Sequence, residues 1–200
     1  MCRCAQLPCH DGMNDPWQRA GRADGGVYVL RARLVWQADL CELGRTPVMV
    51  VSAGAKSILD LPKTLEVLET HGVTVLGFGT DEFPAFFTPK SGLKLPHHVR
   101  DAEEAAKVMH AKWALGLSGG LVVANPVPEA EGFDAGAATE QAMKEAIQQG
   151  IEGKALTPFL LQRIAEITDG QSLTANVSLV KHNAMVGTAI AVAYASLQTH

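Results

Sequence analysis

Short apolar runs alternate with helical patterns from residue 47 onward, and this alternation restricts the fold more than any other feature of the chain. The runs are residues 48–51, 73–78 and 121–124. Each is short and apolar enough for a strand that is buried on both faces. Strands that alternate with helices favour an α/β fold, here a three-layer α/β/α arrangement with a largely parallel central sheet.

Capping residues mark where two of the helices begin and end. Asp60 before Pro62 is typical of a helix start, and Gly72 is typical of a helix end. Asp101 and Glu104 are spaced as in a capping box, in which the two side chains satisfy backbone amides of the first turn. These signals predict one helix before and one helix after the second apolar run.

Three more helices are expected in the second half of the chain. They cover residues 135–149, the segment that begins at Thr157, and residues 172–197. In the last segment, apolar side chains recur at steps of three, four or seven. We expect its buried stripe to include Leu173, Val177, Val180, Ala184, Ala191 and Ala195.

Residues 1–37 differ in composition from the rest of the chain. All four cysteines lie at or before residue 41, and every Lys or Arg before Thr46 is an arginine. Because Pro and Gly recur over residues 1–26 without periodicity, we expect a disordered, unrelated head before a domain at 38–200. The CxC spacing at the N-terminus matches no common zinc site, which argues against a zinc site built from Cys2, Cys4, Cys9 and His10.

Charge and hydropathy exclude several classes of function. The net charge of -4 and the pI near 6.0 give no general electrostatic reason to bind nucleic acid or an anionic membrane. No apolar run reaches the roughly 18 residues of a membrane-spanning helix. The head lacks the apolar core of a secretory signal, and residues 198–200 are not an S-K-L signal. The cytoplasm is therefore the default expectation.

Lys56 stands out on chemical grounds, because it follows a strand and a small-residue turn just before a helix. Ligands of parallel sheets bind beyond the carboxyl ends of the strands. A helix N-terminus and partial desolvation both disfavour an ammonium ion, so the pKa of Lys56 is expected to fall, leaving an amine able to form an imine with a sugar aldehyde. The amides there and Ser57 could instead hold a phosphate, and a solvated surface lysine is the third interpretation.

Other polar residues are weaker candidates. Asp81 and Glu82 follow a strand and could face a cleft, although acidic residues are common in turns. His97 and His98 lie in a Pro-flanked loop and are more typical of a solvated pair than of a ligand set.

Among the polar residues of the last helical segment, Asn176, Lys181 and Asn183 interrupt its apolar pattern. Asn176 falls close to the apolar stripe. We therefore expect its side chain either to be hydrogen-bonded within the protein or to face a ligand.

Several segments, taken together, resemble a known family. They are RTP followed by VSAGAKSILDLPKTLEVLETHGV, and then GTDEFPAFF, GGLVVANPVPE, GKALTPFLLQRIAEIT and SLTANVSLVKHNA. In this order they resemble the pseudouridine-5'-phosphate glycosidases, also called the indigoidine synthase A-like family, from Ala38 to about Ala195. The resemblance covers about the C-terminal half of a family member, so the expected fold is incomplete relative to the family.

The resemblance implies reversible cleavage of the C–C glycosidic bond of pseudouridine 5'-phosphate, which gives uracil and ribose 5-phosphate. Lys56 matches the family's catalytic lysine, which forms an imine with the opened ribose. Gln37, Ala38 and Asp39 stand at the family's S-A-D-L segment, which contacts substrate. Asn176 resembles an active-site asparagine that binds uracil.

The chain departs from the family pattern at the metal site and in the N-terminal half. The family binds Mn²⁺ through an aspartate at the position of Val35, and a valine cannot coordinate a hard cation. Gln37 replaces the family serine. Residues 1–37 resemble neither the segment with the general-acid glutamate nor that with the phosphate-contacting lysine. We therefore expect a shortened member with an unrelated head.

Two classes of function stay open. The first is an enzyme of pseudouridine catabolism with small-molecule partners, possible as a homo-oligomer because the resemblance implies a trimer. The second is a catalytically inactive fragment that acts at most as an interaction partner of full-length subunits. Because general acid catalysis is worth roughly 10²–10⁴-fold, we expect little or no glycosidase activity from the isolated chain.

Overall fold

The computed structural model describes residues 26–29, 38–55 and 60–198. Within these residues, five strands form one parallel sheet in the order β1-β2-β5-β3-β4. The strands are β1 (Gly26–Val29), β2 (Val48–Ser52), β3 (Thr74–Phe78), β4 (His98–Val99) and β5 (Leu121–Ala124). The helices are α1 (Ala38–Leu43), α2 (Leu61–Thr70), α3 (Ala102–Ala114), α4 (Gly136–Gln148), α5 (Leu156–Ile167) and α6 (Gln171–Gln198), with a 3-10 turn η1 (Gly153–Ala155) before α5.

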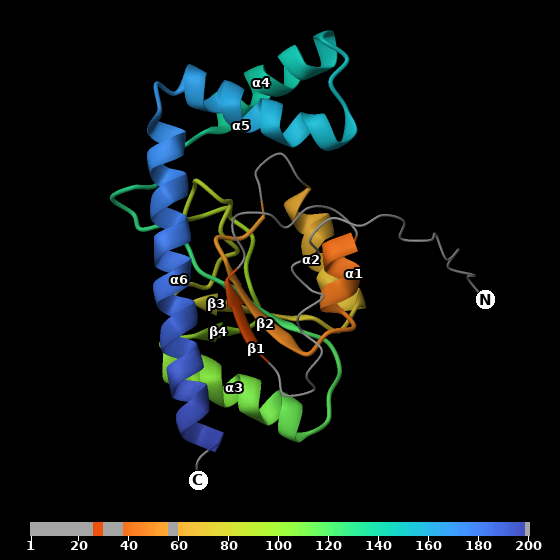
Figure 1. The fold of residues 1–200 in the computed structure, drawn as a ribbon, viewed down its shortest axis with the longest axis vertical. Helices are drawn as coiled ribbons and strands as arrows, with labels where there is room; N and C mark the ends of the chain where they lie inside the picture. The colour runs from red at the N-terminus through yellow and green to blue at the C-terminus, as the bar shows by residue number, and fades with distance from the viewer. Residues whose placement is uncertain (1–25, 30–37, 56–59, 199–200) are drawn as a thin grey trace, which may run out of the picture.

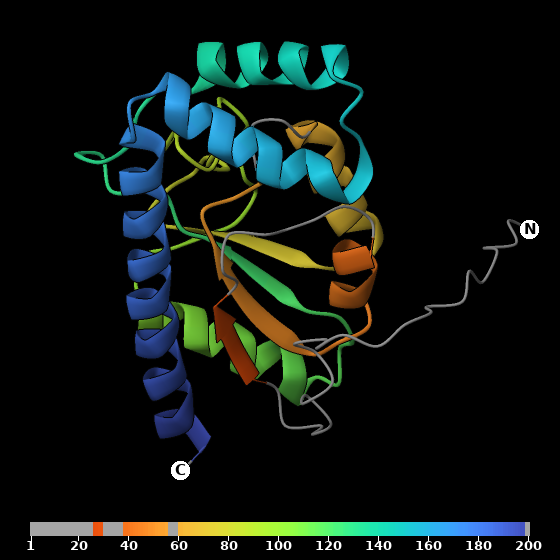
Figure 2. The same cartoon turned by 45° about the horizontal axis from the view of Figure 1, so that its top comes forward.

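Helices cover both faces of this sheet (Figures 1 and 2). Every residue of β2 and β5 is buried. On one face, Leu43 of α1 and Leu68 of α2 pack in a cluster with Val50. On the other face, Met109 of α3 and Ile190 of α6 pack in a second cluster with the sheet. The predicted three-layer α/β/α fold with a parallel central sheet is therefore confirmed.

The three predicted strands and five predicted helices are all present, and Asp60 and Asp101 both act as N-caps. The Oδ1 atom of Asp60 accepts a hydrogen bond from the backbone N–H of Lys63 at 3.1 Å. The Oδ1 atom of Asp101 accepts one from the N–H of Glu104 at 2.9 Å. The Glu104 carboxylate itself bonds the N–H of Arg100 at 2.7 Å, so this capping box is shifted by one residue.

Four short elements, β1, β4, α1 and the 3-10 turn η1, were not predicted. β1 lies within the segment assigned to the head, and it pairs with β2 in parallel from Gly26–Val48 to Val29–Val51. Elements of two to six residues are too short to show a hydrophobic period, which is why the pattern did not reveal them. Where the head ends and the domain begins stays a prediction.

The face of α6 that packs on the sheet differs from the predicted stripe. Leu173 and Val177 are 60% and 47% exposed, and Ala184, Ala191 and Ala195 are exposed as well. The buried residues are instead Ser172, Ala175, Leu179, Asn183, Val186, Gly187 and Ile190. Apolar side chains lie all around this 28-residue helix, so periodicity alone could not select its buried face.

No helix in the described part of the chain combines the length and apolar character that a membrane crossing needs.

The backbone after β2 packs closely against the loop at residues 84–86, which restricts the residue type at position 54. The N–H of Phe86 donates to the carbonyl of Ala53 at 3.0 Å, and Gly54 forms an antiparallel bridge with Ala85. Gly54 has a φ of 79°, and a Cβ atom at this position would lie 1.8 Å from the carbonyl oxygen of Pro84. Only glycine meets both constraints.

α4 and α5 lie side by side at one end of α6, at the top of Figures 1 and 2. Ala142 of α4 and Leu160 of α5 belong to one apolar cluster. The Arg163 guanidinium of α5 also donates to the Glu145 carboxylate of α4, with Nη2 3.1 Å from Oε1. This hydrogen bond, followed by one from Gln141, lowers the pKa of Glu145 from its ordinary value.

The contact between Gly54 and Pro84 predicts a difference between two glycine substitutions. Gly92 has a φ of 78° but no atom near its absent Cβ, so it is the matched control. Gly92→Ala should lower the free energy of unfolding by about 1–2 kcal/mol from the positive φ alone. Gly54→Ala should lower it by about 1–3 kcal/mol more, because its methyl group overlaps the Pro84 carbonyl. Urea denaturation measures both values, and equal losses would contradict the described course of the loop.

The lowered pKa of Glu145 predicts a pH-dependent effect of Glu145→Gln. A carboxylate with a lowered folded-state pKa stabilises the protein above its unfolded pKa, and this stabilisation is lost as the pH falls through the folded pKa. The variant should therefore melt below the wild type at pH 7, with a gap that closes in acid. Glu140→Gln on the same helix is the control, because Glu140 pairs with Lys144 in an exposed position where ion pairs stabilise little. Identical melting of the two variants at pH 7 would refute this role of Glu145.

Candidate active site

Several residues predicted to form the site lie outside the described residues. Ala38 and Asp39 begin α1, but the structure describes only their backbone. Of the candidate residues named in the sequence analysis, those outside the described ranges are Lys56, Ser57, Gln37, Val35, Cys2, Cys4, Cys9 and His10. Their predicted roles stay predictions, and the site is built here from the residues around them.

Two strand ends leave the sheet side by side at its carboxyl edge. β2 pairs with β5 from Met49–Leu121 to Ser52–Ala124. The pairing continues beyond the strands, because the N–H of Asn125 donates to the carbonyl of Ser52 at 2.8 Å. The segment that leads to Lys56 and the Asn125 segment therefore start from adjacent points, at the edge where parallel sheets bind ligands.

Asn125 is joined to α6 by a buried amide pair. Asn125 and Asn183 are each 1% exposed. The Nδ2 atom of Asn125 donates to Oδ1 of Asn183 at 2.9 Å. His182 lies beside this pair, with its Nδ1 atom 3.2 Å from Nδ2 of Asn125 and 3.3 Å from the carbonyl oxygen of Pro126. The pair thus fixes the middle of α6 against the end of β5.

Four of the six buried polar side-chain atoms that lack a partner in the described residues belong to the strand ends and to α6; the other two are on α3 and α4. Among the described residues, Oδ1 of Asn125 and Nδ2 of Asn183 have no hydrogen-bond partner, and the same holds for Oγ of Ser52 and Oδ1 of Asn176. Most buried polar side-chain atoms in proteins are paired, and each unpaired one costs about 1–3 kcal/mol. Such groups at a strand-end edge are ready to pair with a bound molecule or an ordered water.

Asn176 lies on α6, and its predicted role stays a prediction. It is half-buried on α6, with its Oδ1 atom buried and unpaired. Because Asn176 and Asn183 are seven residues apart, they lie on one side of the helix, about 10 Å apart along its axis. The structure therefore leaves Asn176 able to face a ligand, which is one of the two expectations from the sequence.

The acidic residues after β3 brace a loop. Asp81 forms an exposed ion pair with Lys94, and the hydrogen bond from that ammonium holds the pKa of Asp81 below its ordinary value. The Glu82 carboxylate accepts a hydrogen bond from the N–H of Gly92 at 3.0 Å. Both contacts close the turn from residue 81 to residue 94, so neither carboxylate is a strong candidate for the site.

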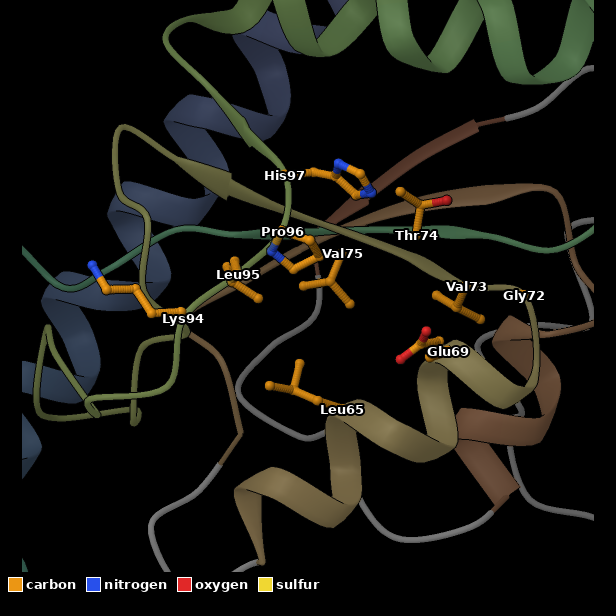
Figure 3. A pocket seen from close by; sticks show the side chains of 10 residues that line it. All are labelled: Leu65, Glu69, Gly72, Val73, Thr74, Val75, Lys94, Leu95, Pro96 and His97. Carbon is orange, nitrogen blue, oxygen red and sulfur yellow. The ribbon is translucent and has the colours of Figure 1, made fainter.

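The remaining polar candidates, His97, His98 and Lys181, have exposed side chains. His97 lines a cavity of about 350 Å³ between α2, the first half of β3 and residues 94–97. Figure 3 shows Leu65 and Glu69 rising from α2 toward Val75 on the sheet side of this cavity. The cavity reaches back to Gly72 and Thr74, at the amino end of β3. At its other end, Leu95 packs in one apolar cluster with Ala55 and Ala124 of the strand-end edge.

The described residues contain no group of three or more His, Cys, Asp or Glu side chains that could hold a metal ion. The implied manganese position, Val35, lies outside the described ranges. The manganese expectation is therefore untested, and valine offers no donor atom for such an ion.

The pairing of Asn125 with Asn183 was not predicted, although both residues stood in segments that the sequence analysis singled out. They are separated by 58 positions, and no local pattern connects them. The available signal was an asparagine directly after an apolar strand, together with two asparagines seven residues apart on one helix.

Comparison with known families and sequences gives consistent matches. The family model described as "Indigoidine synthase A like protein" matches residues 24–193. A pseudouridine-5'-phosphate glycosidase from Caldanaerobacter subterraneus subsp. tengcongensis is 59% identical over 158 residues, which cover 78% of this chain and 52% of the relative. One from Arabidopsis thaliana is 51% identical over 163 residues, covering 80% of this chain and 49% of the relative. The chain spans about half the length of the curated relatives it matches.

Solved structures agree with these matches. The crystal structure of the prealnumycin C-glycosynthase AlnA in complex with ribulose 5-phosphate has a TM-score of 0.72 at 32% identity, covering 82% of this chain and 55% of AlnA. An indigoidine synthase A-like protein from Thermotoga maritima has a TM-score of 0.68 at 36% identity, covering 80% of this chain and 54% of its own. With the family match over residues 24–193, these likenesses establish that the chain belongs to the indigoidine synthase A-like family.

Proposed function

We propose that this chain acts on pseudouridine 5'-phosphate and reversibly cleaves its C–C glycosidic bond to uracil and ribose 5-phosphate. The isolated chain is proposed to do so far more slowly than a complete relative, because residues 1–37 do not resemble the family segment with the general acid. The observation that carries the proposal is the 59% identity, over 158 residues, to a protein named as the glycosidase of this nucleotide. The AlnA complex adds support, because a C-glycosynthase of similar fold binds a pentulose 5-phosphate. The unpaired polar atoms at the strand-end edge suit a polar ligand of this kind.

Lys56 is the proposed nucleophile. Its amine nitrogen bonds to C1' of the ribose as the C1'–O4' bond breaks, and O4' takes a proton. Protonation of uracil at C5 then allows the C1'–C5 bond to break. The electron pair of that bond restores the uracil double bond, while the nitrogen lone pair forms the C1'=N imine. Water hydrolyses the imine to ribose 5-phosphate and regenerates the lysine.

The other predicted residues hold the two ends of the substrate. Asp39, with Gln37 and Ala38 beside it, is proposed to contact the substrate at the segment that begins α1. Asn176 is proposed to bind uracil, because a primary amide offers both a donor and an acceptor to an imide edge. Its buried, unpaired Oδ1 atom supports this role. No step depends on Mn²⁺, since Val35 supplies no ligand.

Borohydride trapping tests the proposed role of Lys56. Incubation with ribose 5-phosphate and borohydride should add one reduced pentose phosphate to the protein, and peptide mass spectrometry should locate it at Lys56. Lys56→Ala should remove the adduct, whereas Lys63→Ala, a nearby exposed lysine on α2, should retain it. Any release of uracil from pseudouridine 5'-phosphate by the wild type should be absent in Lys56→Ala. It should continue when a metal chelator is added to the wild type. An adduct that survives in Lys56→Ala, or none in the wild type, would refute the role.

The outer face of α6 favours a second function, association with another chain. Lys181 is the only Lys, Arg, Asp or Glu in residues 171–198. Large apolar side chains stand 47–64% exposed along this helix at Leu173, Val177, Met185 and Val192. Apolar surface in a row of this kind is typical of an interface. We propose that it contacts a second copy of the chain, with the trimer implied by the family resemblance as the expected assembly.

Charge substitutions on α6 test the proposed self-association. Met185→Glu combined with Val192→Glu should shift the protein to a monomer in light scattering coupled to size-exclusion chromatography, because each charge would be desolvated in the interface. Lys107→Glu, at an exposed position on α3, should leave the assembly unchanged. A wild type that is monomeric at all concentrations would contradict the proposal.

A further inference from the structure

The buried amide pair at the strand-end edge has hydrogen-bonding capacity that the described residues do not use. As oriented, Oδ1 of Asn125 and Nδ2 of Asn183 are unpaired. If both amides are turned over, the bond between them reverses, and Nδ2 of Asn125 and Oδ1 of Asn183 are left instead. Either orientation therefore leaves one donor and one acceptor free, both within side chains that are 1% exposed.

The chemistry of the pair restricts what it can bind. Two neutral amides provide no charge to balance a phosphate, which proteins hold with Arg, Lys or a helix N-terminus. One free donor and one free acceptor instead match a hydroxyl group, which both donates and accepts.

The pair lies beside the end of β2, the strand that leads toward Lys56. The N–H of Asn125 bonds the carbonyl of Ser52, four residues before Lys56, which is proposed to attack the sugar. Asn176, proposed to bind uracil, lies about 10 Å away along α6. One uracil ring is too small to bridge that separation, so the amide pair and Asn176 serve different parts of the nucleotide.

We propose that the Asn125–Asn183 pair binds a hydroxyl group of the ribose moiety of the substrate. The inference rests on the proposed function and adds a sugar-binding site to it. Asn183 contacts the hydroxyl from α6, and Asn125 contacts it from the end of β5. The bound sugar is therefore hydrogen-bonded to both the helix and the sheet. An ordered water is the competing occupant, because it also offers a donor and an acceptor.

Side-chain amide NMR tests this site in the folded wild-type chain. The Asn125 and Asn183 NH₂ resonances should move and saturate when ribose 5-phosphate is added. Neither uracil nor inorganic phosphate should move them. In Asn183→Leu, the Kd for ribose 5-phosphate should weaken about 3- to 10-fold, the effect of one neutral hydrogen bond. Thr139→Val is the control, because it removes another buried, unpaired polar atom, on α4, and should leave the Kd unchanged.

The possible outcomes are distinguishable. Resonances that stay in place with ribose 5-phosphate, or that move with uracil or phosphate alone, would overturn the inference and leave an ordered water as the occupant. A borohydride adduct at Lys56 together with unmoved amide resonances would overturn the sugar contact and leave the proposed function intact. Amide resonances that move with ribose 5-phosphate, without a borohydride adduct at Lys56, would support the sugar site and refute the proposed imine at Lys56.

Discussion

The parallel pairing of β2 with β5 is the contact on which the rest of the structure depends. Both strands are fully buried, and they run in register from Met49–Leu121 to Ser52–Ala124. Because they are parallel, their carboxyl ends meet at one edge. The helices on the two faces bury the outward-facing side chains, and the hydrogen bond from Asn125 to Ser52 carries the pairing one residue beyond the strands. The segment before Lys56 is thereby placed beside Asn125 and, through Asn183, beside α6.

This edge is built at some cost in stability. Gly54 lies too close to the Pro84 carbonyl for any side chain to fit. Phe86, whose N–H donates to the carbonyl of Ala53, has a positive φ of 63°. The amide atoms of Asn125 and Asn183 that lack a partner within the protein would cost about 1–3 kcal/mol each if no water or ligand paired with them. A bound sugar hydroxyl would satisfy those atoms. The free protein would therefore be less stable than its complex, as linkage requires of any ligand that binds only the folded state.

The sequence predicts the layers and the order of the main elements because their signals are local. The apolar run at residues 48–51 and the caps at Asp60 and Asp101 need no tertiary information. The buried face of α6 was predicted wrongly, since apolar residues surround that helix and only packing decides which of them meet the sheet. The amide pair joins residues 58 positions apart, so it could emerge only from the fold. Lys56 was singled out from its place after a strand and from its family resemblance.

The central claim is that the carboxyl ends of β2 and β5, with α6 beside them, form a sugar-binding site around Lys56. A crystal structure of the chain after borohydride reduction with ribose 5-phosphate tests it most directly. The account predicts a pentose phosphate bonded to Nζ of Lys56, with one of its hydroxyl groups within hydrogen-bond distance of both Asn125 and Asn183. A sugar found instead in the cavity lined by Leu65, Glu69 and His97, or one bonded to Lys56 but remote from the amide pair, would contradict it.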